Sequence, residues 1–116
     1  MQIRTIMAAV AAVVAIADVA VAQDTRPNPV KTCADVRAYI DPDGSMTMET
    51  FKKVLIATGR SWGPQQEGGL DNQCKVTAYV KNVIMVQHVT PTILLTTRVV
   101  NDGGVCKLTN ISIDGC

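Results

Sequence analysis

The spacing of hydrophobic and polar residues divides the chain into a helical part and an extended part. Apolar residues recur three and four positions apart over 33–40 and again over 48–58, which predicts two amphipathic helices. After Cys74 the spacing changes to two and holds over most of the segment to Val86, as in a half-buried strand. The even-numbered apolar residues expected to face the core are Cys74, Val76, Ala78, Val80, Ile84 and Val86.

The C-terminal third of the sequence predicts a β-hairpin. Thr92–Val100 is rich in β-branched residues, and Asn101–Gly104 is typical of a tight turn between antiparallel strands. A three-residue loop in that turn pairs Leu95 with Ile111 and leaves one apolar and one polar face. We therefore expect an α+β fold in which two N-terminal helices pack on a three-stranded antiparallel sheet.

Two segments show neither the helical spacing of three and four nor the strand spacing of two. Gln23–Lys31 contains two prolines and predicts an extended N-terminal arm, while residues 32–116 form a single domain. Arg60–Gln73 contains three glycines and a proline, so we expect a long irregular loop of the kind that often carries a binding function. The candidate binding residues in this loop and in the connection after the first strand are Trp62, Gln65, Gln87 and His88.

The first 22 residues predict a secretory signal peptide. Arg4 supplies a positive charge, Ile6–Ala17 is an apolar run, and Ala20-Val21-Ala22 is a small-x-small cleavage site before Gln23. The apolar run is shorter than the roughly twenty residues that a membrane-spanning helix needs. We expect a secreted protein, extracellular or periplasmic, without stable membrane insertion.

The chain has four cysteines, Cys33, Cys74, Cys106 and Cys116, and all of them follow the predicted cleavage site. An even number in a short exported chain predicts two disulfides, and the wide spacing does not suit a zinc site. The strand order favours Cys33 with Cys116 and Cys74 with Cys106. The face assignment and the strand spacing oppose the second pair, so the sequence leaves the pairing open.

The segment "DPDGSMTMETFKKVL" has the spacing that opens an EF-hand calcium loop. Counted from Asp41, however, Met46 replaces the glycine at position six, and Lys52 replaces the bidentate glutamate at position twelve. A turn at Asp43 followed by a helix capped by Ser45 or Thr47 explains the same residues. We expect no metal site and no cofactor.

Charge and catalytic motifs argue against two further classes of function. The net charge is +1 at pH 7 and the two signs are interspersed, so no basic face for nucleic acid is indicated. His88 is the sole histidine, and no serine lies in a nucleophile motif. We expect that the protein is not an enzyme, and the alternative is a small hydrolase that uses His88.

The segment "QHVTP", Gln87–Pro91, resembles the Q-x-V-x-G hairpin with which cystatins block papain-like proteases. The resemblance covers Gln87 and Val89, while Pro91 stands in place of the glycine and the cysteine spacing differs. It implies a protease inhibitor that acts through this hairpin. Our main hypothesis from the sequence is a small secreted, non-catalytic binding protein, an effector or interaction module, with a protein partner.

Overall fold

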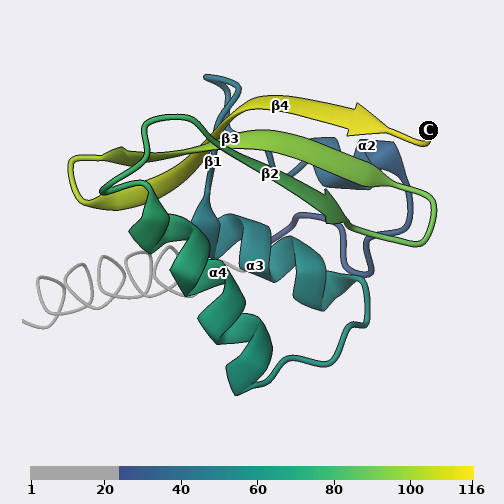
Figure 1. Ribbon diagram of the computed structural model, residues 1–116. Helices are drawn as coiled ribbons and strands as arrows, with labels where there is room; N and C mark the ends of the chain where they lie inside the picture. The colour runs from purple at the N-terminus through teal and green to yellow at the C-terminus, as the bar shows by residue number, and fades with distance from the viewer. Residues whose placement is uncertain (1–23) are drawn as a thin grey trace, which may run out of the picture.

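The computed structural model describes residues 24–116, so the predicted signal peptide lies outside the described residues. These residues form an α+β fold with a four-stranded antiparallel sheet in the order β1-β4-β3-β2. Helices α3 and α4 pack under one face of the sheet, and α2 lies beside the C-terminus (Figure 1). The elements are α2 Cys33–Arg37, β1 Met46–Thr47, α3 Met48–Ala57, α4 Pro64–Val76, β2 Val83–His88, β3 Leu94–Asp102 and β4 Val105–Asp114.

Helices α2 and α3 lie where the two N-terminal helices were predicted, but a third helix, α4, follows them and the sheet has four strands, so the predicted counts of helices and strands do not match. The additional strand, β1, comprises only Met46 and Thr47, which pair with Leu108 and Lys107 of β4. Two residues are too few to show an alternating pattern, so periodicity could not reveal this strand. Thr47 also caps α3, because its side chain accepts a hydrogen bond from the Thr50 N–H.

The prediction of an irregular loop over 60–73 is also wrong, because α4 occupies most of it. Pro64 is the first residue of this helix, where its missing N–H costs nothing, and the Gln66 side chain accepts a hydrogen bond from the Gly63 N–H. Two consecutive glycines within the helix, and Leu70 as its single buried residue, remove the apolar stripe that normally marks a helix. The three glycines, one at the N-cap and two within α4, therefore hide this helix from a reading of the sequence pattern.

Helix α4 continues to Val76, so the predicted strand from Cys74 to Val86 is reduced to β2. The predicted orientation of its side chains is reversed. Val83 and Met85 are buried, whereas Ile84 and Val86 are 59% and 60% exposed. A turn separates α4 from β2, and the alternation counted from Cys74 does not pass through it.

The β3–β4 hairpin is present, with a different register from the one predicted. The loop consists of Gly103 and Gly104, both with positive φ, and is therefore one residue shorter than expected. Leu95 pairs with Ile113 rather than with Ile111, because the shorter loop moves the pairing by one position and a β-bulge between Thr96 and Arg98 moves it by one more. The bulge includes Asn110 at φ 50°, a conformation that asparagine adopts more readily than most residues.

The turn before α3 has the structure that the sequence predicts. The Asp43 carboxylate accepts hydrogen bonds from the Ser45 N–H and hydroxyl, at 3.0 and 2.7 Å. These two hydrogen bonds hold the pKa of Asp43 below its ordinary value. The Asp43 carboxylate is therefore engaged in hydrogen bonds within the turn.

Two disulfides close the fold. Cys33 bonds to Cys116, which joins α2 to the C-terminus, and Cys74 bonds to Cys106, which joins α4 to β4. Both pairs are the ones favoured from the sequence. The objection to the second pair disappears because Cys74 lies on a helix under the sheet, 5.8 Å from Cys106 between Cα atoms, and not in a strand.

Candidate functional site

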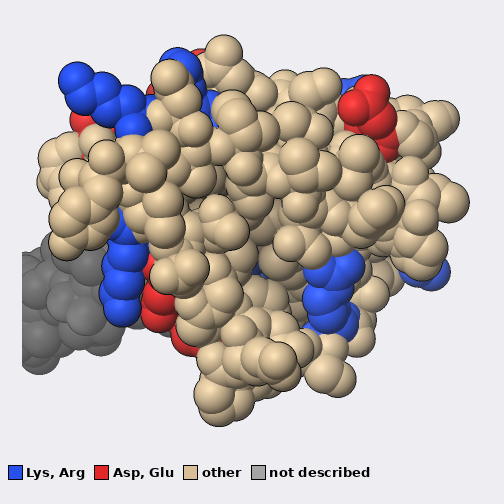
Figure 2. Space-filling model, in the orientation of Figure 1, with Lys and Arg blue, Asp and Glu red and all other residues tan. Residues whose placement is uncertain are grey.

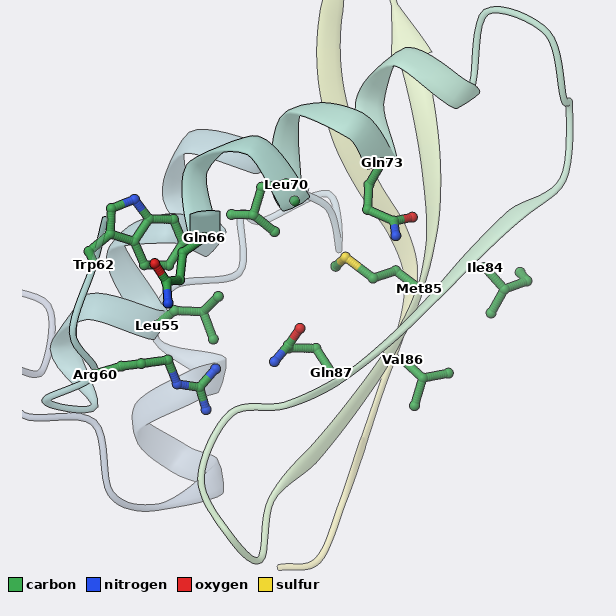
Figure 3. A pocket seen from close by; sticks show the side chains of 11 residues that line it. Leu55, Arg60, Trp62, Gln66, Leu70, Gln73, Ile84, Met85, Val86 and Gln87 are labelled. Atoms are coloured by element: carbon green, nitrogen blue, oxygen red, sulfur yellow. The ribbon is translucent and has the colours of Figure 1, made fainter. Parts of the chain in front are cut away.

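A groove lies between α4, the C-terminal end of α3 and strand β2, with a volume of about 320 Å³. Figure 3 shows Met85 and Gln87 of β2 pointing into it, while Ile84 and Val86 lie on the other side of the strand. We call it the α4–β2 groove. Its lining residues are Leu55, Arg60, Trp62, Gln66, Gly69, Leu70, Gln73, Ile84, Met85, Val86 and Gln87.

The inner part of the groove is apolar and its rim is polar. Leu55, Leu70 and Met85 belong to the hydrophobic core and form the apolar part, and all three are buried. The polar part includes three uncharged amides, those of Gln66, Gln73 and Gln87. A small apolar cavity with a few hydrogen-bonding groups around it is the usual composition of a ligand site.

The position of Trp62 is fixed by a chain of polar contacts. Its indole N–H donates to Oε2 of Glu67 at 2.7 Å, and Lys52 Nζ donates to Oε1 of the same carboxylate at 2.8 Å. Lys52 is on α3 and Glu67 is on α4, so this carboxylate joins the two helices and the tryptophan. The half-buried Trp62 therefore forms an ordered wall of the groove.

Arg60 lies at the end of the groove nearest the C-terminus of β2. Its Nη2 donates to the carbonyl oxygens of His88 and Val89, at 2.7 and 3.1 Å. Among residues 24–116 Arg60 forms no ion pair, and it is the only charged side chain in the described lining. The groove therefore carries one positive charge without a neighbouring carboxylate in its lining.

The structure brings together two of the four predicted binding residues. Trp62 and Gln87 both line the groove, although they are 25 positions apart in the sequence. His88 is next to it and contributes its carbonyl to Arg60, whereas Gln65 is exposed on α4 and does not line the groove. Sequence reasoning missed Arg60, Gln66 and Gln73. The two glutamines lie on α4, the helix that the glycines conceal, and Arg60 precedes it.

In the hairpin that resembles the cystatin motif, Gln87–Pro91, the second matching residue is buried and its backbone groups are hydrogen-bonded within the protein. Val89, the second matching residue, is 0% exposed, and its N–H donates to the Ile93 carbonyl at 2.9 Å. Its own carbonyl accepts a hydrogen bond from Arg60. This conformation does not present Val89 to a protease, so protease inhibition stays a prediction that the geometry does not favour.

Other kinds of site are not apparent in the described part of the chain. Residues 24–116 contain no cluster of three or more histidine, cysteine or acidic residues that could hold a metal ion. Within the same range no helix is long and apolar enough to cross a membrane. The protein-family models, the curated proteins and the solved structures contain no match to this chain.

Acid should release Trp62 from this network. The Glu67 carboxylate accepts hydrogen bonds from Lys52 and Trp62, and these hold the pKa of Glu67 below the ordinary value of 4.5. The folded state therefore favours the charged carboxylate. The stabilisation is complete above pH 4.5 and is lost as the pH falls through the lowered pKa. Because Trp62 is the only tryptophan, we expect its fluorescence to titrate below pH 4.5.

The matched control for this titration is Glu67→Gln, which keeps the shape of the side chain and removes its charge. Tryptophan fluorescence of this variant should be flat over the range below pH 4.5 in which the parent protein titrates. If Glu67→Gln shows a fluorescence transition with the same midpoint as the parent, the signal comes from another group. That result would contradict the contact between Trp62 and Glu67.

Proposed function

We propose that this chain is an exported, non-catalytic binding protein, an effector or interaction module, that holds a segment of a protein partner in the α4–β2 groove. The observation that carries the proposal is the groove itself. It has an apolar interior, three amides and one unpaired positive charge, and its tryptophan wall is held in place. Nothing in this set supplies a nucleophile with an adjacent base, which favours binding over catalysis.

Export is the second part of the proposal. It is supported by the N-terminal sequence and by the two disulfides, which persist in oxidising compartments and are rare in the cytosol. Two linkages in a domain of this size also keep the groove walls in place outside the cell. Helix α4, which forms one wall, is bonded directly to the sheet through Cys74 and Cys106.

Two neighbouring glycines on α4 provide a matched test. Gly69 lines the groove and Gly68 does not, yet a Cβ atom built on either one meets nothing within 4 Å. Gly69→Tyr should fill the groove and weaken partner binding at least about tenfold, equivalent to about 1.4 kcal/mol. Gly68→Tyr should leave binding unchanged, since it adds the same ring outside the groove.

The measurement is capture of partners from the native extracellular fluid on the immobilised, oxidised protein, followed by titration of the captured partner. Circular dichroism should show that both variants keep the native helix content. If both variants bind the partner as the parent does, the groove is not the binding surface. If the parent captures no partner, the binding function itself is wrong.

A further inference from the structure

Strand β2 is an edge of the sheet, and its outer side borders the groove. It is the last strand in the order β1-β4-β3-β2, and among residues 24–116 no other segment forms backbone hydrogen bonds along its outer side. Figure 1 shows β2 at the side of the sheet above α4, and Figure 2 shows that this face of the molecule bears mostly uncharged side chains with a few scattered charges. An edge of this kind presents a row of unpaired backbone donors and acceptors.

The hydrogen-bond pattern identifies which residues present them. The Val89 N–H donates to Ile93 on the β3 side, and bonded and non-bonded residues alternate along an antiparallel strand. The odd-numbered residues of β2 therefore turn their backbone groups toward β3. The even-numbered residues turn them outward: these are Ile84, Val86 and His88.

Arg60 occupies one end of this outer edge. Its guanidinium donates to the carbonyl of His88, the last of the three outward-facing residues. The N–H and carbonyl groups of Ile84 and Val86 have no such partner among the described residues. The backbone N–H and carbonyl groups of Ile84 and Val86 are thus available to form hydrogen bonds with an added strand.

We propose that the groove binds an extended peptide segment of the partner as an additional strand on β2, and that this segment carries a carboxylate that meets Arg60. The inference rests on the proposed function and specifies the chemistry of the partner. Main-chain hydrogen bonds to Ile84 and Val86 give the peptide its extended form. Alternate side chains of the peptide enter the groove, because successive residues of a strand point to opposite faces.

The lining sets the sequence preference. The peptide needs an acidic residue beside Arg60, the sole charged group of the described lining, and an apolar residue against Leu55, Leu70 and Met85. Both side chains must point to the helix side of the sheet, so they are separated by an even number of positions. The remaining residues on that side can bond to the three amides.

A second copy of this chain fits the edge less well. Val83–His88 contains no carboxylate that could meet Arg60. In a symmetric antiparallel pairing centred on Met85, position 81 of one copy lies opposite position 89 of the other. Lys81 would then approach the end of the groove where Arg60 binds the Val89 carbonyl, and the two like charges would repel.

The test begins with a display library of random octapeptides selected on the oxidised protein. Enriched sequences should combine an acidic and an apolar residue at an even spacing. A synthetic peptide with the enriched sequence is then methylated at one backbone nitrogen at a time. Methylation of the nitrogens that donate to β2, which are every second one, should weaken binding more than about tenfold. Methylation of the intervening nitrogens should change it less than twofold.

Charge is tested on the same peptide. Arg60→Gln should weaken binding about tenfold, while a peptide in which glutamine replaces the acid should bind both proteins equally. Lys81→Gln is the control, because it removes a charge outside the lining. Hydrogen exchange at the Ile84 and Val86 amides should slow when the peptide is bound, since both gain hydrogen bonds.

Three results would overturn the inference: no enriched peptide, affinity that is indifferent to backbone methylation, or a concentration-dependent dimer that Ile84→Lys dissociates. The last result would assign the edge to a second copy. Each is distinguishable from failure of the proposed function. If Gly69→Tyr blocks the natural partner while methylation has no effect, the groove is correct and strand addition is wrong.

Discussion

Removing the bond between Cys74 and Cys106 should lower the free energy of unfolding by about 2–4 kcal/mol and abolish binding in the groove. The residues between the two cysteines include all of β2 and β3. Leu70 is the single buried residue of α4, so the disulfide is a major part of the attachment of this helix to the sheet. In Cys74→Ser/Cys106→Ser the helix should separate from β2.

The matched control is Cys33→Ser/Cys116→Ser. Its bond spans 83 residues against 32, so the loss of stability should be at least as large on loop-entropy grounds. This bond joins α2 to the C-terminus, away from the residues that line the groove, so peptide binding should persist while the variant is folded. The two double variants should therefore lose similar stability and differ in affinity.

Urea unfolding gives the stability of each variant, and hydrogen exchange at α4 amides gives the local effect. Exchange in α4 should accelerate selectively without the Cys74–Cys106 bond. Equal acceleration in the two double variants would mean that α4 is held by the whole fold. The disulfide would then have no special part in fixing the groove wall.

Patterns with strong local signals were predicted correctly, and elements that depend on distant partners were not. Helix α3 has a capping threonine and five buried residues on one face, which is why its limits were close to those expected. Strand β1 is defined by its pairing with β4 alone, because two residues contain no pattern. The hairpin turn was located, but its register depends on the loop length and on the bulge at Asn110, whose left-handed conformation has no clear mark in the sequence.

The candidate site shows the same division. Trp62 and Gln87 were selected for their own chemistry, as a lone tryptophan and as part of a motif, and both line the groove. Arg60 was not selected because its significance comes from the absence of a carboxylate near it in the described lining. Gln66 and Gln73 are seven positions apart, about two turns of helix, and they share a face only because 64–76 is helical.

Phe51→Ala should lower the free energy of unfolding by about 3–5 kcal/mol, the cost of emptying a large site in a packed core. Phe51 is 0% exposed and is the largest fully buried side chain of the described residues. It lies on α3, among the buried residues of that helix. A domain of this size is stabilised by about 5–14 kcal/mol in total, so much of its stability would be lost. We expect a fall of about 12–40 °C in the midpoint of thermal unfolding.

Ile56→Ala is the control on the same helix. Ile56 is 44% exposed, and alanine favours helix more than isoleucine does, so the substitution should change stability by less than about 1 kcal/mol. The contrast isolates burial from helix propensity, since both substitutions introduce the same residue into α3. Equal and small effects in thermal unfolding would show that α3 does not pack under the sheet. In that case Leu55, on the same helix, would no longer form the apolar part of the groove.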